Sequence, residues 1–485
     1  MSTPIPQPPG VPLLGNIFDV DPNNTWWSLK TLAEKYGEWA ILDIDRRCGC
    51  GLGRQADHDR PGVGEIFQIK VLGHRLVFVA SAALAEELCD EKRFRKFVGG
   101  PIVEIRYTVH DSLFSAFAHE ESWGVAHRLI APQLAPGAIA SHFEELLQCT
   151  DDLVAKWRGL DPESRVRPLD DLQRLNVEAT ALTLFGKKIN GLSGPAHPVI
   201  QAMEDATSEA MKRPNRPKLL NWLVHGGKLK KATKTLREFG AELVKHRQQN
   251  PSDRQDLLWT LMNAKDPETG KALTESQVID EIVTMPIGSS TAPCAIATGI
   301  FFLLQNPDTI ARAREEIDAV AGDGSLTQEH IPQLHYLAGV VRETLRLSCA
   351  APGFNIEPIP KPGDESPVLL GGGKYQIAHN QAMIIVLAGV NRDPAVFDEP
   401  LAFRPERMVG EAFEQLPTGV KKWFGNGKRE CIGKHWAWEF LVVVLASLIR
   451  EVDFEAVDPS YQLKQDGWFN IRPVDFLIKV KPRVR

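Results

Sequence analysis

Cys431 is the residue in this chain whose setting most clearly predicts chemistry. It lies in a glycine-rich segment, Phe424-Gly-Asn-Gly-Lys-Arg-Glu-Cys-Ile-Gly433, just before an apolar stretch from His435 to Ile449 that predicts a helix. A thiolate at the start of a helix is stabilised by the positive end of the helix dipole and by free backbone N–H groups. The segment therefore predicts a thiolate ligand, and a buried structural cysteine beside a C-terminal helix is the alternative.

Four neighbours of this cysteine favour a flat, anionic ligand. Gly427 and Gly433 allow backbone conformations, and a close approach to the ligand, that a side chain would block. Phe424 would shield the sulfur from water, and Arg429 would offer a fixed cation to a carboxylate.

These residues match the pattern F-x-x-G-x-R-x-C-x-G, and here the chain resembles the haem-thiolate signature of the cytochrome P450 family. A chance match at five fixed positions is improbable, on the order of 1 in 10,000 for a chain of this length. The resemblance implies that Cys431 is the ligand of the iron in haem b (iron protoporphyrin IX). It also implies that Phe424, Gly425, Arg429 and Gly433 surround the cofactor.

A second group of residues resembles the contacts that this family makes with the haem propionates. Trp123 and His127 are four residues apart in a predicted helix, so both side chains reach the same anionic group, although a tryptophan alone is more often a core residue. The resemblance assigns both to propionate binding, together with Lys96. It places the ring of Phe114 above the haem.

An apolar segment opens at a predicted capping box, Thr274-Glu-Ser-Gln277, and ends at Asn306-Pro307. Two prolines inside it, Pro286 and Pro293, remove helix N–H donors, so a kinked buried helix is expected. An ordinary turn at Gly288-Ser-Ser-Thr291 is the alternative.

The resemblance places the oxygen-binding segment of the family in this helix. Gly288 would open the helix for dioxygen, and Thr291 would manage protons. Ser290 stands where most members carry an acid. Proton supply is therefore expected to run through hydroxyl groups and water, or to matter less than usual.

Glu343 and Arg346 are three residues apart on a predicted helix and are expected to form a salt bridge. The E-x-x-R pattern is common by chance, and its value here lies in its order ahead of Cys431. The resemblance implies that this pair joins Arg407, in the segment Phe403–Arg407, to support the cysteine loop.

The resemblance assigns four residues to the pocket for a hydrophobic substrate: Phe114, Ile287, Ala351 and Phe354. In soluble fatty-acid hydroxylases of the family an Arg and a Tyr hold the substrate carboxylate. These positions fall on His74 and Phe78 of a predicted strand pair, Ile66–Val79, with its turn at Gly73. A simple fatty-acid clamp is therefore not expected.

Other segments carry weaker predictions. Residues 383–390 and 468–480 alternate as strands, and the latter would form a C-terminal hairpin. Residues 211–224 change from basic and proline-broken to apolar, which predicts a loop between helices with one buried side, or contact with a lipid surface. Lysines cluster around the cysteine loop, where they would steer an acidic electron donor or only bind propionates and water: Lys421, Lys422, Lys428 and Lys434.

Composition limits the remaining choices. The net charge of -6 argues against a general nucleic-acid binder, and seven scattered cysteines indicate a reducing compartment. The proline-rich start, Met1 to Gly15, has no apolar run, so no signal peptide or transmembrane anchor is expected and the protein is expected to be cytoplasmic. Residues 39–64 are rich in Gly, Arg and Asp and predict a disordered insertion, or translated non-coding sequence.

The resemblance implies one haem-thiolate domain over residues 1–485, mainly α with small β elements. The haem would lie between the kinked helix near Thr291 and the loop of Cys431. Most similar are soluble haem domains of self-sufficient fatty-acid hydroxylases, which are fused to a diflavin reductase. This chain stops at Arg485, so a separate NADPH-linked diflavin reductase or another donor is expected.

The expected reaction inserts one oxygen atom from O2 into a hydrophobic small molecule, a lipid or a secondary metabolite. The missing acid keeps a second hypothesis open: an enzyme that uses peroxide, or rearranges a lipid hydroperoxide, without a reductase. A haem-binding sensor without turnover is the third.

Overall fold

The structure is a computed structural model that describes residues 2–21, 24–36, 65–71, 73–467 and 469–484. The insertion predicted at residues 39–64 lies outside these ranges. The chain divides into two compact units. The strand-rich unit comprises Met1–Phe97, Glu343–Arg404 and Gly410–Cys431, and the helical unit comprises Val98–Arg342, Pro405–Val409 and Ile432–Arg485.

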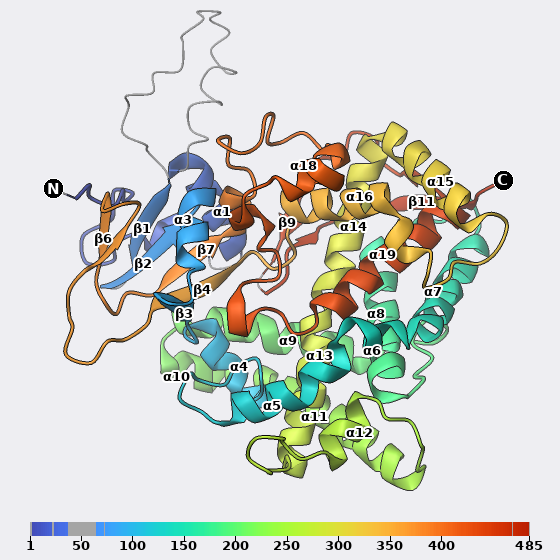
Figure 1. Cartoon of the computed structure of the whole chain (residues 1–485), viewed down its shortest axis with the longest axis horizontal. Helices are drawn as coiled ribbons and strands as arrows, with labels where there is room; N and C mark the ends of the chain where they lie inside the picture. The colour runs from blue at the N-terminus through green and yellow to red at the C-terminus, as the bar shows by residue number, and fades with distance from the viewer. Residues whose placement is uncertain (1, 22–23, 37–64, 72, 468, 485) are drawn as a thin grey trace, which may run out of the picture. The chain divides into compact units, whose positions relative to one another are not determined.

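The strand-rich unit is built on a five-stranded sheet in the order β1-β2-β7-β4-β3 (Figure 1). Only the β2–β7 pair is parallel. The strands are β1 (Ile66–Val71), β2 (His74–Val79), β3 (Phe94–Lys96), β4 (Gly353–Pro358) and β7 (Met383–Val386). The unit also contains β5 (Val368–Leu370), β6 (Tyr375–Ile377), α1 (Thr25–Tyr36), α3 (Ala82–Leu88), α17 (Leu387–Val390) and α18 (Gly410–Glu414).

Two strand predictions have different outcomes in this unit. The pair predicted over Ile66–Val79 is confirmed as β1 and β2, with Gly73 at φ +85° in the turn. The strand predicted over residues 383–390 is wrong in its second half, which is the short helix α17. Gly389 packs so closely on Ala80 that an added Cβ would lie 2.6 Å from the Ala80 side chain, which fixes the backbone at this position.

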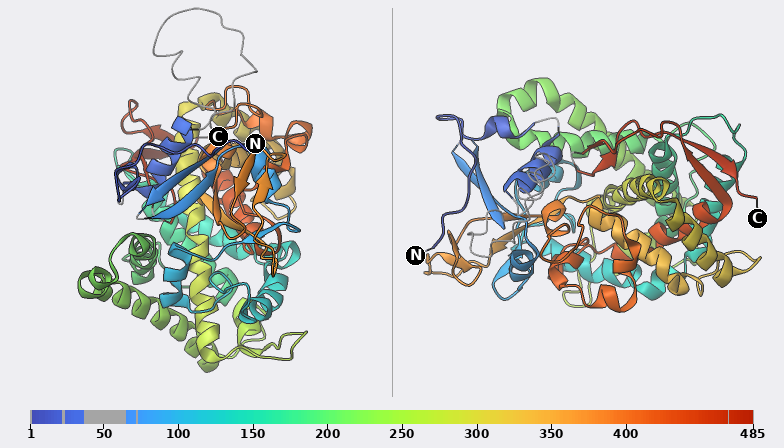
Figure 2. Two further views of the ribbon diagram at one scale, coloured as in Figure 1. Left: turned by 90° about the vertical axis from the view of Figure 1, so that its left-hand side faces the viewer. Right: turned by 90° about the horizontal axis from the view of Figure 1, so that it is seen from above.

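The helical unit contains most of the helices that the structure describes (Figures 1 and 2). They are α4 (Pro101–Val109), α5 (Ser122–Ile130), α6 (Pro136–Ala140), α7 (Phe143–Arg158), α8 (Pro168–Phe185), α9 (Pro198–Lys212), α10 (Lys218–Leu220), α11 (Gly226–Gln249), α12 (Leu257–Asn263), α13 (Glu275–Ser289), α14 (Thr291–Gln305), α15 (Pro307–Ala321) and α19 (Lys434–Glu451). Helix α16 (His335–Leu347) runs from this unit into the strand-rich one. The family-based expectation of mainly α structure with small sheets is confirmed.

The apolar segment from residue 275 to 305 forms two successive helices, α13 and α14, which Figure 2 shows as parts of one long yellow rod. The capping box at Thr274 is confirmed, Pro286 lies inside α13, and Ser290 separates the two helices. Within the described residues, this is the one stretch long and apolar enough to cross a membrane, and 67% of its most apolar window is buried in protein. A soluble core helix passes the same test.

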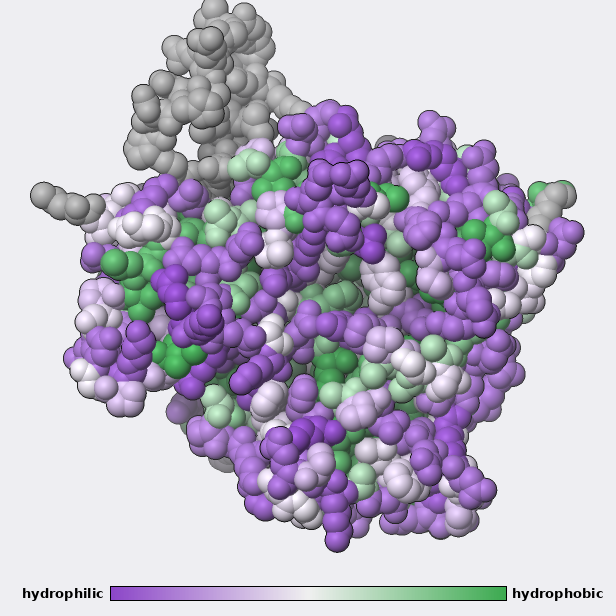
Figure 3. Space-filling model, viewed as in Figure 1, coloured by the Kyte–Doolittle hydropathy of each residue, from purple (hydrophilic) through white to green (hydrophobic). Residues whose placement is uncertain are grey.

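The C-terminal strands are shorter than the alternation over residues 468–480 predicted. Strand β11 (Ile478–Pro482) pairs with β8 (Val452–Ala456), which directly follows α19, and two-residue strands β9 (Gln465–Asp466) and β10 (Arg472–Pro473) form the hairpin. A C-terminal hairpin is thus present, but its strands are only two residues long, and the later part of the predicted segment pairs with β8 instead. On the face drawn in Figure 3, hydrophilic residues predominate and the hydrophobic ones form small groups.

Candidate active site

The Cys431 loop is held by its own backbone and by one carboxylate. The N–H of Cys431 donates to the carbonyl of Phe424 at 2.8 Å, and Gly425 and Gly427 have φ of +83° and +64°, which favour glycine. Glu91 accepts a hydrogen bond from the N–H of Lys428 at 2.7 Å. A Cβ on Gly427 would lie 2.2 Å from the Glu91 carboxylate, so a side chain there would displace Glu91 from the loop.

Burial distinguishes Cys431 from the other cysteines that the structure describes. Cys431 is exposed, although α19 begins only three residues later. Burial raises the pKa of the Cys89 thiol to about 11 and the pKa of Cys149, Cys294 and Cys349 to about 12. The alternative of a buried structural cysteine is therefore wrong for Cys431, and the other four are the inert thiols.

Two cations lie close to Cys431 within the strand-rich unit. Lys96 is half-buried at the end of β3, and its pKa falls to about 8, first through burial and then through the positive charge of Arg429. The sulfur of Cys431 acts in the opposite direction on the pKa of Lys96. Because two cations this close repel, the arrangement suits a ligand whose carboxylates neutralise both.

The predicted salt bridge between Glu343 and Arg346 is confirmed and is fully buried. Arg346 donates to both carboxylate oxygens, at 2.7 and 2.8 Å, and to the carbonyls of Asn391 and Pro400 at 3.0 and 2.7 Å. Glu343 also accepts from the N–H of Arg404 at 2.8 Å. The pair thus fixes residues 391–404, and its link to Arg407, in the 3-10 turn Pro405–Met408, stays a prediction.

The two substrate residues predicted in the strand-rich unit lie at one strand. Ala351 precedes β4, and Phe354 lies in β4 opposite Ile385 of β7. Both are half-buried. Their contact with a substrate stays a prediction.

In the helical unit, Trp123 and His127 share one face of α5 as predicted. Their ring centroids are 5.0 Å apart at 32°, and both side chains are half-buried. Arg128 points elsewhere: its guanidinium donates to both carboxylate oxygens of Asp266, at 2.6 and 2.8 Å. The helix therefore offers Trp123 and His127 together, which is the pair that the sequence predicted.

Phe114 is positioned by a buried carboxylate that the sequence did not reveal. Its ring packs edge-on against Phe469, with centroids 5.9 Å apart. The neighbouring Leu113 donates its N–H to Glu281 of α13 at 2.8 Å. Burial raises the pKa of Glu281 to about 8. Two adjacent acids in an otherwise apolar stretch, Asp280 and Glu281, were the available signal, but nothing in the sequence indicated their partners.

The predicted oxygen-binding residues lie at the junction of α13 and α14. Ile287 is buried, whereas Gly288 is exposed and an added Cβ would meet nothing within 4 Å. Thr291 donates from Oγ1 to the Gly288 carbonyl at 3.2 Å. The role of Gly288 and Thr291 toward dioxygen stays a prediction.

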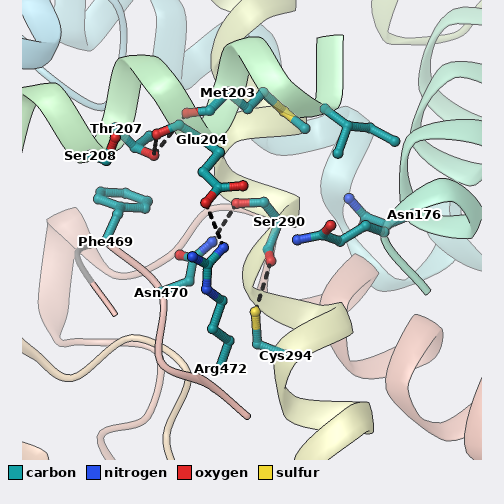
Figure 4. A pocket seen from close by; sticks show the side chains of 12 residues that line it. Asn176, Met203, Glu204, Thr207, Ser208, Ser290, Cys294, Phe469, Asn470 and Arg472 are labelled. Carbon is teal, nitrogen blue, oxygen red and sulfur yellow. Dashed lines mark hydrogen bonds and ion pairs between the residues drawn. The ribbon is translucent and has the colours of Figure 1, made fainter. Parts of the chain in front are cut away.

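Ser290 faces a polar cavity within the helical unit (Figure 4). Its Oγ donates to the Ile287 carbonyl at 2.7 Å and accepts from Asn470 Nδ2 at 2.7 Å. On the other side of the turn, Ser289 Oγ accepts from Asn176 Nδ2 at 3.0 Å. The sequence pointed to Ser290 but to neither asparagine.

The cavity has a volume of about 50 Å³. This is enough for a few water molecules, which need ~10–15 Å³ each, and far below the ~300 Å³ of a small-molecule site. Arg472 at its wall bonds Glu204 and Asp466, each at 2.8 Å. The buried side-chain oxygens of Asn176 and Asn470 have no hydrogen-bond partner within the described residues, so water suits this space.

Residues 58–480 match the family model for cytochrome P450. The chain belongs to the cytochrome P450 family. It is 33% identical to a bifunctional cytochrome P450/NADPH–P450 reductase of Acremonium egyptiacum, over 99% of this chain and 43% of the relative. A similar protein of Aspergillus oryzae is 34% identical, over 99% and 42%. A self-sufficient cytochrome P450 monooxygenase of Phanerodontia chrysosporium is 32% identical, over 100% and 43%. The chain thus spans less than half the length of these relatives.

Membership of the cytochrome P450 family implies a haem cofactor, and the residues of each unit fit one. The strand-rich unit offers the exposed thiol of Cys431 with the cations of Lys96 and Arg429 beside it. The helical unit offers Trp123 and His127 on one helix face. A thiolate for iron and cations or donors for propionates form the donor set that a haem needs.

Proposed function

We propose that this cytochrome P450 is a monooxygenase that holds haem b. It inserts one atom of O2 into a hydrophobic small molecule, a lipid or a secondary metabolite. Electrons come from an NADPH-linked diflavin reductase or another donor. The relatives from Acremonium egyptiacum and Aspergillus oryzae include an NADPH–P450 reductase. The observation that carries the proposal is the exposed thiol of Cys431, in a loop with the family signature and with Lys96 and Arg429 close by.

In this proposal Cys431 binds the iron, and the bound haem supplies the activation of O2. Arg429, Lys96, Trp123 and His127 hold the propionates. Phe424, Gly425 and Gly433 shape the loop beneath the cofactor, so that water stays away from the sulfur.

In the helical unit, residues of α13 and α14 would serve the reaction with O2. Gly288 leaves room for dioxygen, and the hydroxyl of Thr291 hands over protons. Ser290 lines the polar cavity and precedes Thr291 in the chain, so water bound in the cavity would supply protons through its Oγ. Phe114, Ile287, Ala351 and Phe354 position the substrate.

The Cys431→Ala variant tests the proposal. The carbon monoxide complex of the reduced wild-type protein is expected to show the absorption typical of thiolate ligation, and the variant is expected to lose it entirely. Cys89→Ala is the matched control, because it removes a half-buried thiol from the same unit. An unchanged spectrum in Cys431→Ala refutes the ligand assignment.

Ser290 favours a second candidate function, because a hydroxyl replaces the acid that most members use for proton delivery. In that case the enzyme uses peroxide, or rearranges a lipid hydroperoxide, and needs no reductase. Product formation is compared with NADPH plus a purified diflavin reductase and with hydrogen peroxide alone. Product coupled to NADPH consumption supports the monooxygenase, and equal product from peroxide alone supports the second candidate.

A further inference from the structure

The polar cavity of the helical unit presents two buried carbonyl oxygens that accept no hydrogen bond. They are the side-chain Oδ1 atoms of Asn176, on α8, and of Asn470, between β9 and β10, and neither has a partner among the described residues. Asn176 is only 1% exposed. A buried carbonyl oxygen without a donor is unfavourable, so a group that donates hydrogen bonds is expected to occupy the cavity.

The two serines at the junction of α13 and α14 fix the orientation of both amides. Ser289 and Ser290 each donate the one hydroxyl hydrogen to the backbone carbonyl three residues earlier, at 3.3 and 2.7 Å. Each serine oxygen therefore accepts from an asparagine, Ser289 from Asn176 Nδ2 at 3.0 Å and Ser290 from Asn470 Nδ2 at 2.7 Å. Turning either amide over would place two acceptors against each other. Both Oδ1 atoms are thus left to accept from a ligand or from water.

The charges at the cavity wall favour a neutral ligand. The guanidinium of Arg472 pairs with Glu204 (Figure 4) and with Asp466, each at 2.8 Å. A cation in the cavity would lie near this guanidinium, and an anion would lie near two carboxylates and the two amide oxygens. A hydroxyl group carries no charge and donates one hydrogen bond, so it meets both requirements.

The remaining wall is apolar and leads to a residue that is predicted to contact the substrate. Ile200 and Met203 of α9 and the ring of Phe469 line the cavity. The Phe469 ring also packs against Phe114, with centroids 5.9 Å apart, so one side chain borders both the cavity and Phe114. The volume of about 50 Å³ holds one functional group but not a whole hydrophobic molecule.

We propose that this cavity binds a hydroxyl group of the substrate, with the amide oxygens of Asn176 and Asn470 as acceptors. The proposal rests on the monooxygenase function proposed above, and it names the substrate class as a hydrophobic alcohol rather than a carboxylic acid. The hydroxyl replaces one water molecule in the cavity and donates to one amide oxygen, while a remaining water donates to the other. The apolar part of the substrate then lies along Phe469 toward Phe114. The two asparagines determine specificity and take no part in the reaction with O2.

The test measures ligand binding to the haem-loaded 485-residue chain by equilibrium dialysis. The probes are dodecanol and farnesol, the methyl ether of each, and dodecanoate. Each ether keeps the oxygen and the apolar part of its alcohol but has no hydrogen to donate. Each alcohol is expected to bind about tenfold more tightly than its ether, because the ether leaves a buried acceptor unpaired. Dodecanoate is expected to bind more weakly than dodecanol.

The variants Asn176→Leu and Asn470→Leu each remove one acceptor at a similar side-chain volume. Both are expected to lower the preference for alcohol over ether several-fold, toward equal affinities. The preference is taken within one variant, so a partial loss of folded protein affects both ligands equally. Gln173→Leu is the matched control, because it removes an amide from the wall of the same cavity but neither of the two unpaired oxygens. This variant is expected to keep the wild-type preference.

Equal binding of alcohol and ether to the wild type overturns the proposal, as does tighter binding of dodecanoate or binding of neither alcohol. An unchanged preference in both asparagine variants, or an equal loss in Gln173→Leu, also overturns it and leaves the cavity to water. The carbon monoxide complex of the wild type separates this result from the proposed function. Thiolate-type absorption together with equal binding refutes only the hydroxyl site, whereas absence of that absorption refutes the proposed function.

Discussion

Asn470 donates a hydrogen bond to Ser290 Oγ at 2.7 Å, while Ser290 donates its own hydrogen to the carbonyl of Ile287 at 2.7 Å. The hydroxyl at this position is therefore fixed from both sides. A hydroxyl is a far weaker acid than a carboxyl group, and this one must leave the Ile287 carbonyl before it can pass a proton on. If the chain acts as a monooxygenase, proton supply at Ser290 limits how efficiently NADPH oxidation is coupled to product.

The Ser290→Asp variant is expected to form several-fold less hydrogen peroxide per NADPH. A positioned acid contributes ~10²–10⁴-fold to proton transfer, and Asn470 is in place to donate to the new carboxylate. Peroxide and NADPH are measured together with purified reductase. Ser290→Asn, which has a similar shape but no acid, is the control and is expected to remain like the wild type. An unchanged peroxide ratio in Ser290→Asp means that proton supply is not limiting.

Lys96 is expected to make the stability of the haem-free chain depend on pH. Its pKa falls from 10.5 to about 8 on folding, so between these values the unfolded chain holds a proton that the folded chain lacks. The free energy of unfolding therefore rises with pH across this range, by up to about 3 kcal/mol. Urea unfolding at several pH values measures it. Lys96→Met is expected to abolish the rise, and the exposed Lys92→Met to keep it.

Bound haem is expected to raise the pKa of Lys96 again, because a propionate stabilises the charged ammonium group. Lys96→Met is therefore expected to speed the transfer of haem to an acceptor protein, while Lys92→Met leaves the rate unchanged. Equal rates in both variants would remove Lys96 from the propionate contacts.

Breaking the pair of Glu343 and Arg346 is expected to cost about 3–5 kcal/mol of stability. Both side chains are fully buried, so Arg346→Ala leaves a carboxylate without its cation and removes the donors to the carbonyls of residues 391–402. Chemical unfolding of the variant measures the loss. Glu399→Gln is the control, because the Glu399–Arg404 pair is exposed and is expected to contribute less than about 1 kcal/mol.

Local signals allowed much of this structure to be predicted from the sequence. The capping box at Thr274, the β1–β2 turn at Gly73 and the Glu343–Arg346 pair each depend on residues within a few positions of one another. Runs of apolar residues were a weaker signal for secondary structure than these local motifs. Residues 383–390 fit a strand and a short helix equally well, and the close contact of Gly389 with Ala80 decides between them.

The positions that the sequence did not reveal join residues far apart in the chain. The hydrogen bond between Glu91 and Lys428 joins residues that are 337 positions apart in the sequence. The hydrogen bonds of Asn470 with Ser290 and of Glu281 with Leu113 join residues 180 and 168 positions apart. No periodicity links such residues, because their meeting depends on how the elements pack. The sequence predicted one buried side for the apolar part of residues 211–224, and this is wrong for Leu219, Trp222 and Leu223, which are exposed. A run of apolar residues does not say which way it faces.

Glu281 provides the last prediction, because its carboxyl group is fully buried and holds the backbone beside Phe114. Folding raises its pKa from 4.5 to about 8, chiefly through burial. Between these values the folded chain holds a proton that the unfolded chain has lost, so stability falls as pH rises, by up to about 5 kcal/mol. Glu281→Gln keeps an acceptor for Leu113 and is expected to be the more stable protein at pH 8, measured by urea unfolding. Glu275→Gln, exposed on the same helix, is expected to follow the wild type, and parallel pH profiles for all three proteins would refute the assignment.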